Sequence, residues 1–360
     1  MTASPVVSPS THDLAASRGV QIVVGLDRLR GHRGEIEALA QRCGAPVTGR
    51  STWMMASVCD DPQPWGVLLR DPAGFLRAAA VLVEARGDAA VADVVTLAGT
   101  DPASQGHRGA LLADDRLWAR RLGIALAGAL PSHTRGWAIE IGPIAADSAT
   151  LEGFLAGFPQ LISSAVEPIP MIRRQPDHDS AADYLSPAMR RTLRKATNRL
   201  AADACALEIR FTRSYTEIAE LLPDIERCHR DRDHERGRTS DLDDDGNRAT
   251  WHNRLRELAL DGLLEVSTAH IEGALAAHVV GILDGETYRV LEGHFVTEWG
   301  RYAPGRLLEA AVVQRMLDDP TMTALDWMTS VAPESLLAAN DAQPMIMLRA
   351  GLTSRAAYAG

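Results

Sequence analysis

The chain of 360 residues contains a single lysine, Lys195, and its other basic residues are all arginines. A mechanism that needs a second lysine is therefore excluded. Four cysteines (Cys43, Cys59, Cys205 and Cys228) are widely spaced and form no C-x-x-C pair, which argues against a zinc or redox motif and predicts buried free thiols. No apolar run reaches the roughly 18 residues that would indicate a transmembrane helix. We therefore expect a cytoplasmic protein with no membrane partner.

The composition predicts a protein of two globular domains. Hydrophobic residues make up 46% and charged residues 23% of the chain, so each half is able to bury a core. The net charge of −10 argues against a surface that binds nucleic acid throughout, and DNA in particular. Residues 1–18 lack a basic region followed by an apolar core, and we predict a disordered tail there and not a signal peptide. Nothing in the composition indicates an oligomeric state.

Two stretches of the chain show nearly the same order of elements. Strands at 65–85 and 91–99, a helix at 114–130, a strand at 136–144 and a helix at 148–158 are matched in the second half by three strands within 263–296, a helix at 306–319 and a strand at 323–330. We predict two diverged copies of one α/β (α+β) unit. The Pro-rich stretch at 167–180 favours a boundary there, with domains at 19–175 and 176–360.

The segment WGRYAPGRLLEAA, Trp299 to Ala311, places a loop rich in Gly and Pro between a strand and an apolar helix. A plain strand-to-helix connection explains this pattern. The alternative is an anion site at a helix N-terminus, with backbone amides and guanidinium groups nearby. The residues that would form the anion site are Arg301, Tyr302, Ala303, Gly305 and Arg306.

Three residues near this loop are candidates for catalysis. Glu292 and His294 are two apart in a strand and therefore share one face, which suits a pair that accepts a proton. The alternative is a hydrogen-bonded strand pair without a catalytic role. Asp326 stands at the end of the next strand, either as a site residue or as the N-cap of a following helix.

The region after the boundary separates its charges by sign. Seven basic and two acidic residues lie between Ser186 and Arg213, a net charge of +5. Its helix exposes Arg191, Arg194 and Lys195, either as a solvated face or to recognise phosphate on a substrate or a tRNA. The acid-rich segment that follows includes His229 and Arg230, which we assign to substrate binding. Its histidine spacing does not match a metal motif, so we predict no metal and interpret the segment as a mobile loop that attracts a cationic amine.

Several of these pieces resemble, in order, the CelD-like acetyltransferase branch of the GNAT superfamily, which is related to the Fem-type aminoacyltransferases. They are YLSPAMRRTLRKATNRL, CHRDRDHERG, YAPGRLLEAA and LDWM, across about residues 181–335. The first half resembles a degenerate GNAT repeat. The signature Gln/Arg-x-x-Gly-x-Gly/Ala is reduced to one clear match, Gly305, and the aromatic–lysine pair that relatives carry after LDWM is absent.

The resemblance implies that the C-terminal domain moves an acyl group from acyl-CoA, such as acetyl-CoA, to an amine or hydroxyl of a small-molecule acceptor. A Fem-like enzyme that uses aminoacyl-tRNA as its donor is the alternative, and the basic helix favours it. A third interpretation is an inactive pair of GNAT domains that serves as a scaffold, which the absent lysine and the altered signature favour.

Overall fold

The computed structural model describes residues 19–58, 63–85, 94–100, 108–133, 138–328 and 336–351. The chain forms two compact units. Unit 1 contains residues up to Glu167 and again from Pro344, and unit 2 contains Pro168–Gln343. This division differs from the expected boundary at 175/176, because the last strand of the chain returns to unit 1. The expected tail at 1–18 lies outside the described residues.

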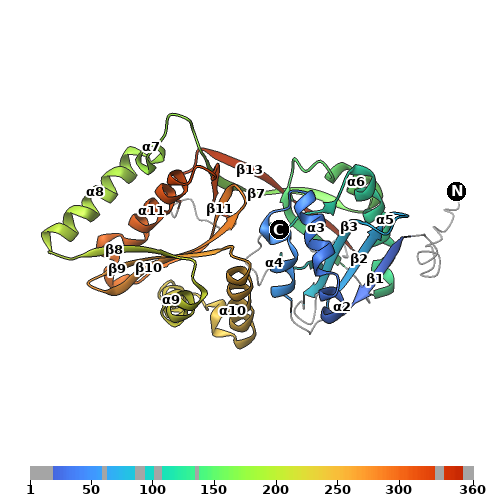
Figure 1. The fold of residues 1–360 in the computed structure, drawn as a ribbon, viewed down its shortest axis with the longest axis horizontal. Coiled ribbons are helices and arrows are strands. Elements are labelled where there is room, and N and C mark those ends of the chain that lie inside the picture. Colours follow the sequence, from blue (N-terminus) through green and yellow to red (C-terminus); the bar gives the residue numbers. More distant parts are fainter. Residues whose placement is uncertain are drawn as a thin grey trace. The chain divides into compact units, whose positions relative to one another are not determined.

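Unit 1 is a sheet with helices on both faces (Figure 1). Its strand order is β1-β2-β3-β4-β6-β13, and β5 pairs with β3. Helices α5 and α6 bury apolar residues against one face, and α2, α3 and α4 cover the other. In chain order the elements are β1 (Val20–Val24), α2 (Leu26–Arg30), α3 (Arg33–Arg42), η1 (Val47–Gly49), α4 (Ser51–Ala56), β2 (Trp65–Arg70), β3 (Leu76–Ala85), β4 (Val94–Leu97), β5 (Leu112–Ala113), α5 (Arg116–His133), β6 (Ala138–Ala145), α6 (Leu151–Gly157), β7 (Ile162–Arg173) and β13 (Asp341–Gly351).

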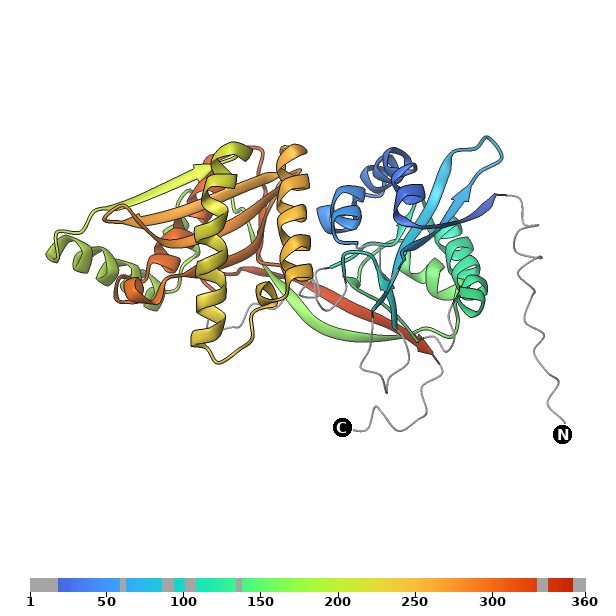
Figure 2. The ribbon, with the colours of Figure 1, turned by 90° about the horizontal axis from the view of Figure 1, so that it is seen from below.

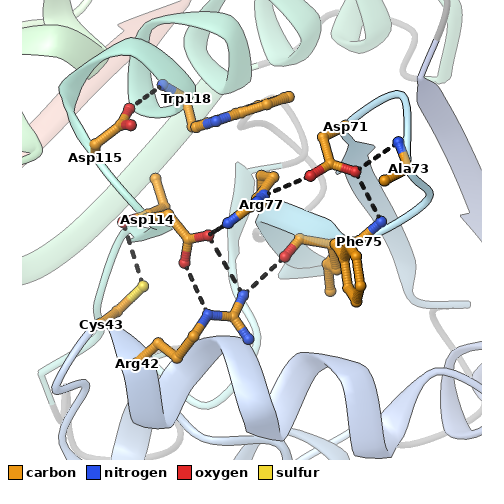
Figure 3. A network of polar contacts seen from close by, with 11 residues as sticks. Arg42, Cys43, Asp71, Ala73, Phe75, Arg77, Asp114, Asp115 and Trp118 are labelled. Carbon is orange, nitrogen blue, oxygen red and sulfur yellow. Dashed lines mark hydrogen bonds and ion pairs between the residues drawn. The ribbon is translucent and has the colours of Figure 1, made fainter.

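A polar network joins helix α3 to the hairpin between β2 and β3 (Figure 3). Arg77 binds both Asp71 (2.9 Å) and Asp114 (3.0 Å). Arg42, at the end of α3, reaches the same Asp114 carboxylate (3.1 Å). The network is largely satisfied within itself and holds secondary-structure elements together, so we assign it a structural role.

Helices α5 and α6 pack backbone against backbone in unit 1. A Cβ built on Gly157 would overlap the carbonyl oxygen of Arg120, and one on Gly123 would overlap that of Phe154. Glycine at these two positions is therefore a requirement of the close helix approach. Gly34 in α3 has no atom near its own missing Cβ.

Unit 2 places its sheet between two pairs of helices. Its strand order is β7-β12-β11-β10-β9-β8. Helices α8 and α11 lie on one face, and α9 and α10 lie side by side on the other (Figures 1 and 2). The elements are α7 (Ala181–Tyr184), α8 (Pro187–Ala202), β8 (Leu207–Thr212), α9 (Tyr215–Glu235), η3 (Asp241–Asp243), α10 (Asp245–Leu260), β9 (Leu264–Ile271), β10 (Ala274–Asp284), β11 (Thr287–Phe295), η4 (Thr297–Tyr302), α11 (Pro304–Asp318) and β12 (Ala324–Asp326).

At one irregular position in strand β11, the alternation of its side chains between the two faces of the sheet shifts by one residue. Val280 pairs with Glu292 but its neighbour Gly281 pairs with Val290, so that Leu291 is an extra residue in β11. Val290 packs in the apolar core with α11. Glu292 instead contacts His229 of α9 on the opposite face. The bulge thus takes the strand from the core to the polar side of the sheet.

Two segments that look irregular in sequence are regular in the structure. Part of the Pro-rich stretch at 167–180 belongs to strand β7 (Ile162–Arg173), which pairs with β12 through Met171, Ile172 and Arg173. The acid-rich segment is ordered helix and turn and not a mobile loop. Asp243 pairs with Arg230 and His234 and accepts from the Ser240 amide at the start of η3, and Asp244 caps α10. No described helix is both long and apolar enough to cross a membrane.

We expect Gly157→Ala to lower the free energy of unfolding by about 1–3 kcal/mol, because the added methyl group forces α5 and α6 apart. Gly34→Ala is the matched control, and we expect it to raise that free energy by up to about 0.5–1 kcal/mol through helix propensity. Urea denaturation of both variants measures the difference. Equal midpoints would show that the helix contact tolerates a side chain.

Candidate active site

The loop between β11 and α11 forms the first part of the candidate site. After η4, Ala303 adopts a left-handed conformation (φ 47°), and α11 begins at Pro304 without a side-chain cap. The first amides of a helix have no acceptor within the helix, and the positive end of its dipole lies there. The start of α11 is therefore suited to bind an anion.

Helix α8 holds this loop in place. The Arg199 guanidinium donates to the carbonyl oxygen of Arg301 (2.8 Å), and the buried Tyr302 hydroxyl donates to Asp203 (2.8 Å). Arg301 also pairs with Asp203 (3.2 Å) and its side chain is 65% exposed. The conformation of the loop is thus fixed from outside, and Arg301 remains accessible to a ligand.

The glycines of this loop are not required by the fold. A Cβ on Gly305 or on Gly300 would meet only the Phe295 ring, at 3.5–3.6 Å, which is ordinary contact, and neither glycine has a positive φ. Space for a side chain is therefore available. A close approach of a ligand to the backbone gives a reason for glycine that the fold does not.

Strands β11 and β12 separate beside the loop. They pair only between Thr287–Arg289 and Ala324–Asp326. Beyond Asp326 the chain turns toward β7, where the Trp327 amide donates to Pro170 (3.2 Å). In the described part of the chain, the ladder between β11 and β12 therefore ends before Val290. A narrow ligand could enter along this edge.

Four side chains from three elements meet on the α9 side of β11. His229 of α9 lies 3.3 Å from the Glu292 carboxylate through Nδ1, and its Nε2 lies 3.3 Å from Asp233. The ring of His294 stacks on that of His229, with centroids 4.1 Å apart. His278 of β10 lies 3.8 Å from Glu292. We refer to His229, His278, Glu292 and His294 as the His–Glu cluster.

The His–Glu cluster is buried and its hydrogen bonding is incomplete. The side chains of His229, His278 and Glu292 are 4%, 0% and 6% exposed. Both ring nitrogens of His278 and Oε1 of Glu292 have no hydrogen-bond partner, and Nδ1 of His229 has only its 3.3 Å contact with the other oxygen of Glu292. Buried polar atoms are normally satisfied, because each unmade bond costs about 1–3 kcal/mol. Such a concentration of unsatisfied atoms is typical of a functional site.

The charges of the cluster differ from those of free side chains. Burial opposes the charge on His229, but the Glu292 carboxylate outweighs burial and raises the pKa of His229. Burial also opposes ionisation of Glu292, yet the charge and hydrogen bond of His229 hold the pKa of Glu292 well below its usual value. Burial, together with the positive charge of His229, lowers the pKa of His294 well below 6.5. The cluster thus combines an ion pair with a neutral imidazole.

Three members of the cluster have donor types that bind metals. One ligand atom each from His229, Glu292 and His294 lies within 4.8 Å of the others. The two imidazole planes are only 22° from parallel, however, so their in-plane lone pairs do not converge on one point. The expectation of a site without metal stays a prediction.

The structure separates the remaining candidates from this centre. Asp326 is fully buried, binds Arg289 through one oxygen and accepts from the Met328 amide (2.7 Å) through the other. Its contacts indicate that it positions the strand end and does not meet a substrate. Arg230 pairs with Asp243 (2.9 Å). Three candidates, Arg191, Arg194 and Lys195, are exposed on α8.

Sequence reasoning missed His278 and Trp251. The Trp251 indole of α10 donates to Glu292 (3.3 Å) and closes the cluster from the side of that helix. Regular pairing from the turn at Asp284 and Thr287 would place Ala277 opposite His294, and only the bulge brings His278 there. A histidine inside an apolar strand was the available signal for His278. No local pattern marked Trp251.

The sequence and fold were compared with known proteins. Residues 187–334 match the family model described as an acetyltransferase (GNAT) domain. Among curated proteins, no sequence matches the chain. The comparison with solved structures is therefore the one that covers both units.

Three solved structures illustrate the likeness. FemX aligns with 83% of this chain and 87% of its own, at 11% identity and a TM-score of 0.57. The C-terminal domain (DUF2156) of a putative lysylphosphatidylglycerol synthetase from Agrobacterium fabrum aligns with 89% of this chain and 91% of its own, at 9% identity and a TM-score of 0.53. A tandem GNAT protein from the clavulanic acid biosynthesis pathway aligns with 93% and 99%, at 16% identity and a TM-score of 0.50.

The family match covers most of unit 2, and the likeness to the tandem GNAT protein extends over both units. Unit 2 therefore matches the acetyltransferase (GNAT) family over residues 187–334, and the fold of the whole chain is similar to that of a tandem GNAT protein.

Proposed function

We propose that unit 2 transfers an acyl group from acyl-CoA, such as acetyl-CoA, to the amine or hydroxyl of a small-molecule acceptor. The observation that carries the proposal is the position of the His–Glu cluster. Its members Glu292 and His294 lie on the strand that runs directly into the loop before α11. The donor phosphates would bind at that loop, and the thioester would lie along the free edge of β11.

The proposed reaction is direct attack on the thioester. The acceptor nitrogen or oxygen forms a bond with the acyl carbon, the carbonyl oxygen gains negative charge, and the C–S bond then breaks to release the CoA thiolate. Backbone N–H groups on the free edge of β11 would stabilise the oxyanion. This assignment gives a role to the strand edge in a protein that lacks the lysine found in relatives.

We propose that His294 accepts the proton that the acceptor loses when it attacks the thioester. Its imidazole is neutral near pH 7 because its pKa is lowered, whereas Glu292 is ionised but a weak base. Glu292 would hold His229 in its charged form and orient the stacked pair. His229, which we expected to bind substrate, would then support the proton acceptor.

Helix α8 favours a second candidate function, with aminoacyl-tRNA as the donor. From Pro187 to Ala202 the helix has five basic residues and no acidic one. Its Arg199 donates a hydrogen bond to the loop before α11, at the carbonyl oxygen of Arg301. Phosphates of an acceptor stem could contact Arg191, Arg194 and Lys195. Mass spectrometry of ligands that co-purify separates the two donors: CoA supports the first candidate and tRNA the second. If neither donor binds in calorimetry, the inactive scaffold is the remaining interpretation.

We expect Gly305→Val to raise the dissociation constant for acyl-CoA by about tenfold or more, because the side chain occupies the space where a phosphate approaches the backbone. Arg306→Ala should raise it less, since it removes one charge. Isothermal titration calorimetry measures the affinity, and thermal unfolding serves as the control. A parallel loss of stability and affinity would show that the loop is only structural.

We expect His294→Gln to lower kcat by about 10²–10⁴, with little change in donor affinity. Glu292→Gln should lower kcat less if it only orients the histidines. His252→Gln, a part-exposed histidine of α10, is the matched control. Turnover within threefold of wild type for both cluster variants would contradict the assignment.

The pH profile of kcat provides an independent check. His294 accepts a proton only when neutral, and its pKa lies well below 6.5. Activity limited by His294 should therefore stay constant as pH falls to 6.5 and decline only at lower pH. If the pH at which kcat declines changes when an acceptor of different pKa is used, that decline reports the ionisation of the acceptor. A decline at or above pH 6.5 that does not depend on the acceptor would contradict the assignment to His294.

A further inference from the structure

A cavity of about 460 Å³ lies in unit 2 between helix α9 and the ends of β10 and β11. Its volume is within the range of small-molecule sites. The cavity lies beside the His–Glu cluster, because its lining residues Cys228 and Phe295 are the immediate chain neighbours of His229 and His294.

The cavity contains both paired and unpaired charges. Asp224 pairs with Arg227 (2.9 Å), and Arg232 pairs with Glu235 (3.3 Å). In the described part of the chain, the two remaining carboxylates of the lining, Asp231 and Glu298, have no hydrogen bond or ion pair. They leave the site with a local charge of −2, which suits an ammonium group.

Arg232 is fixed in a way that leaves one donor unused. Its guanidinium lies over the Phe295 ring, 4.3 Å from the centroid, and its Nη1 bonds to Thr297 (3.1 Å). The Nε atom is buried and has no hydrogen-bond partner. An unfilled buried guanidinium donor is unusual, and the Nε edge is one that carboxylates bind with two parallel bonds.

We propose that the cavity binds the acceptor as an α-amino acid whose side chain carries the nucleophilic amine or hydroxyl. The carboxylate of the ligand binds the guanidinium of Arg232, whose side chain is 19% exposed and lines the cavity, and its α-ammonium group lies against Asp231 and Glu298. The side chain extends past Cys228 and Phe295 toward His294. This inference rests on the proposed acyl transfer and names the class of its acceptor.

Three probes separate the two ends of such a ligand. Lysine carries both the carboxylate and the α-ammonium group, cadaverine lacks the carboxylate, and 6-aminohexanoate lacks the α-ammonium group. We expect Arg232→Gln to raise the dissociation constants of lysine and 6-aminohexanoate by about tenfold or more, and not to raise that of cadaverine, because the carboxylate of Glu235 loses its cationic partner. Arg232→Lys should recover part of the loss, because it keeps the charge without the planar fork.

The double variant Asp231→Asn/Glu298→Gln should have the opposite pattern. We expect it to raise the dissociation constants of lysine and cadaverine by about tenfold and to leave that of 6-aminohexanoate unchanged. Glu220→Gln removes a carboxylate of α9 that does not line the cavity and is the matched control. Calorimetry with each probe, in the presence of CoA, measures binding without any need for turnover, and thermal unfolding checks that each variant folds.

The results distinguish this inference from the proposed function. The site for an α-amino acid is supported if the Arg232 variant weakens only the probes with a carboxylate and the double variant weakens only the probes with an ammonium group in the α position. Equal weakening of all three probes by one variant, or no binding of lysine to the wild-type protein, overturns it. If CoA binds and simple amines are acylated without dependence on Arg232, the acyl transfer stands and the amino-acid site falls.

Discussion

The extra residue in β11 is the constraint on which the active-site geometry of unit 2 depends. Without Leu291 out of register, Glu292 and His294 would continue the alternation of Val290 and enter the apolar core beside α11. The bulge places them instead against His229 of α9. Two ionisable groups in an apolar core would cost several kcal/mol each, so the bulge allows one strand to serve both the core and the chemistry.

The electrostatics of the cluster follow from that placement. Burial removes water from His229, Glu292 and His294 together, so each charge state is set mainly by its neighbours. One ion pair forms between Glu292 and His229, and His294 stays neutral because burial opposes its charge and the positive charge of His229 adds repulsion. The unfilled hydrogen bonds of His278 are a cost to stability, which the apolar core around α11 and the sheet offsets.

The loop before α11 shows the same division between fold and function. Its anchors, Tyr302 with Asp203 and Arg199 with the Arg301 carbonyl, hold the backbone rigid from the side of α8. Its glycines have no structural need to be glycine. Rigid support on one side with open backbone on the other is the arrangement that binds phosphate without reorganisation, and it lies at the end of the strand that holds the cluster.

The sequence by itself determined most elements of both units and their repeated order, because hydrophobic periodicity and turn residues are local properties. It also determined that Glu292 and His294 share a face, and that a loop with Arg301 and Gly305 opens a helix. It did not determine that the start of the Pro-rich stretch at 167–180 belongs to strand β7, since pairing with β12 overrides local composition there. Nor did it place His229 and His278 beside Glu292. Those contacts join residues that are 63 and 14 positions apart from Glu292 in the chain, through a helix packed across the sheet and a one-residue bulge. Only tertiary packing decides both, because no local pattern records which helix face meets which strand.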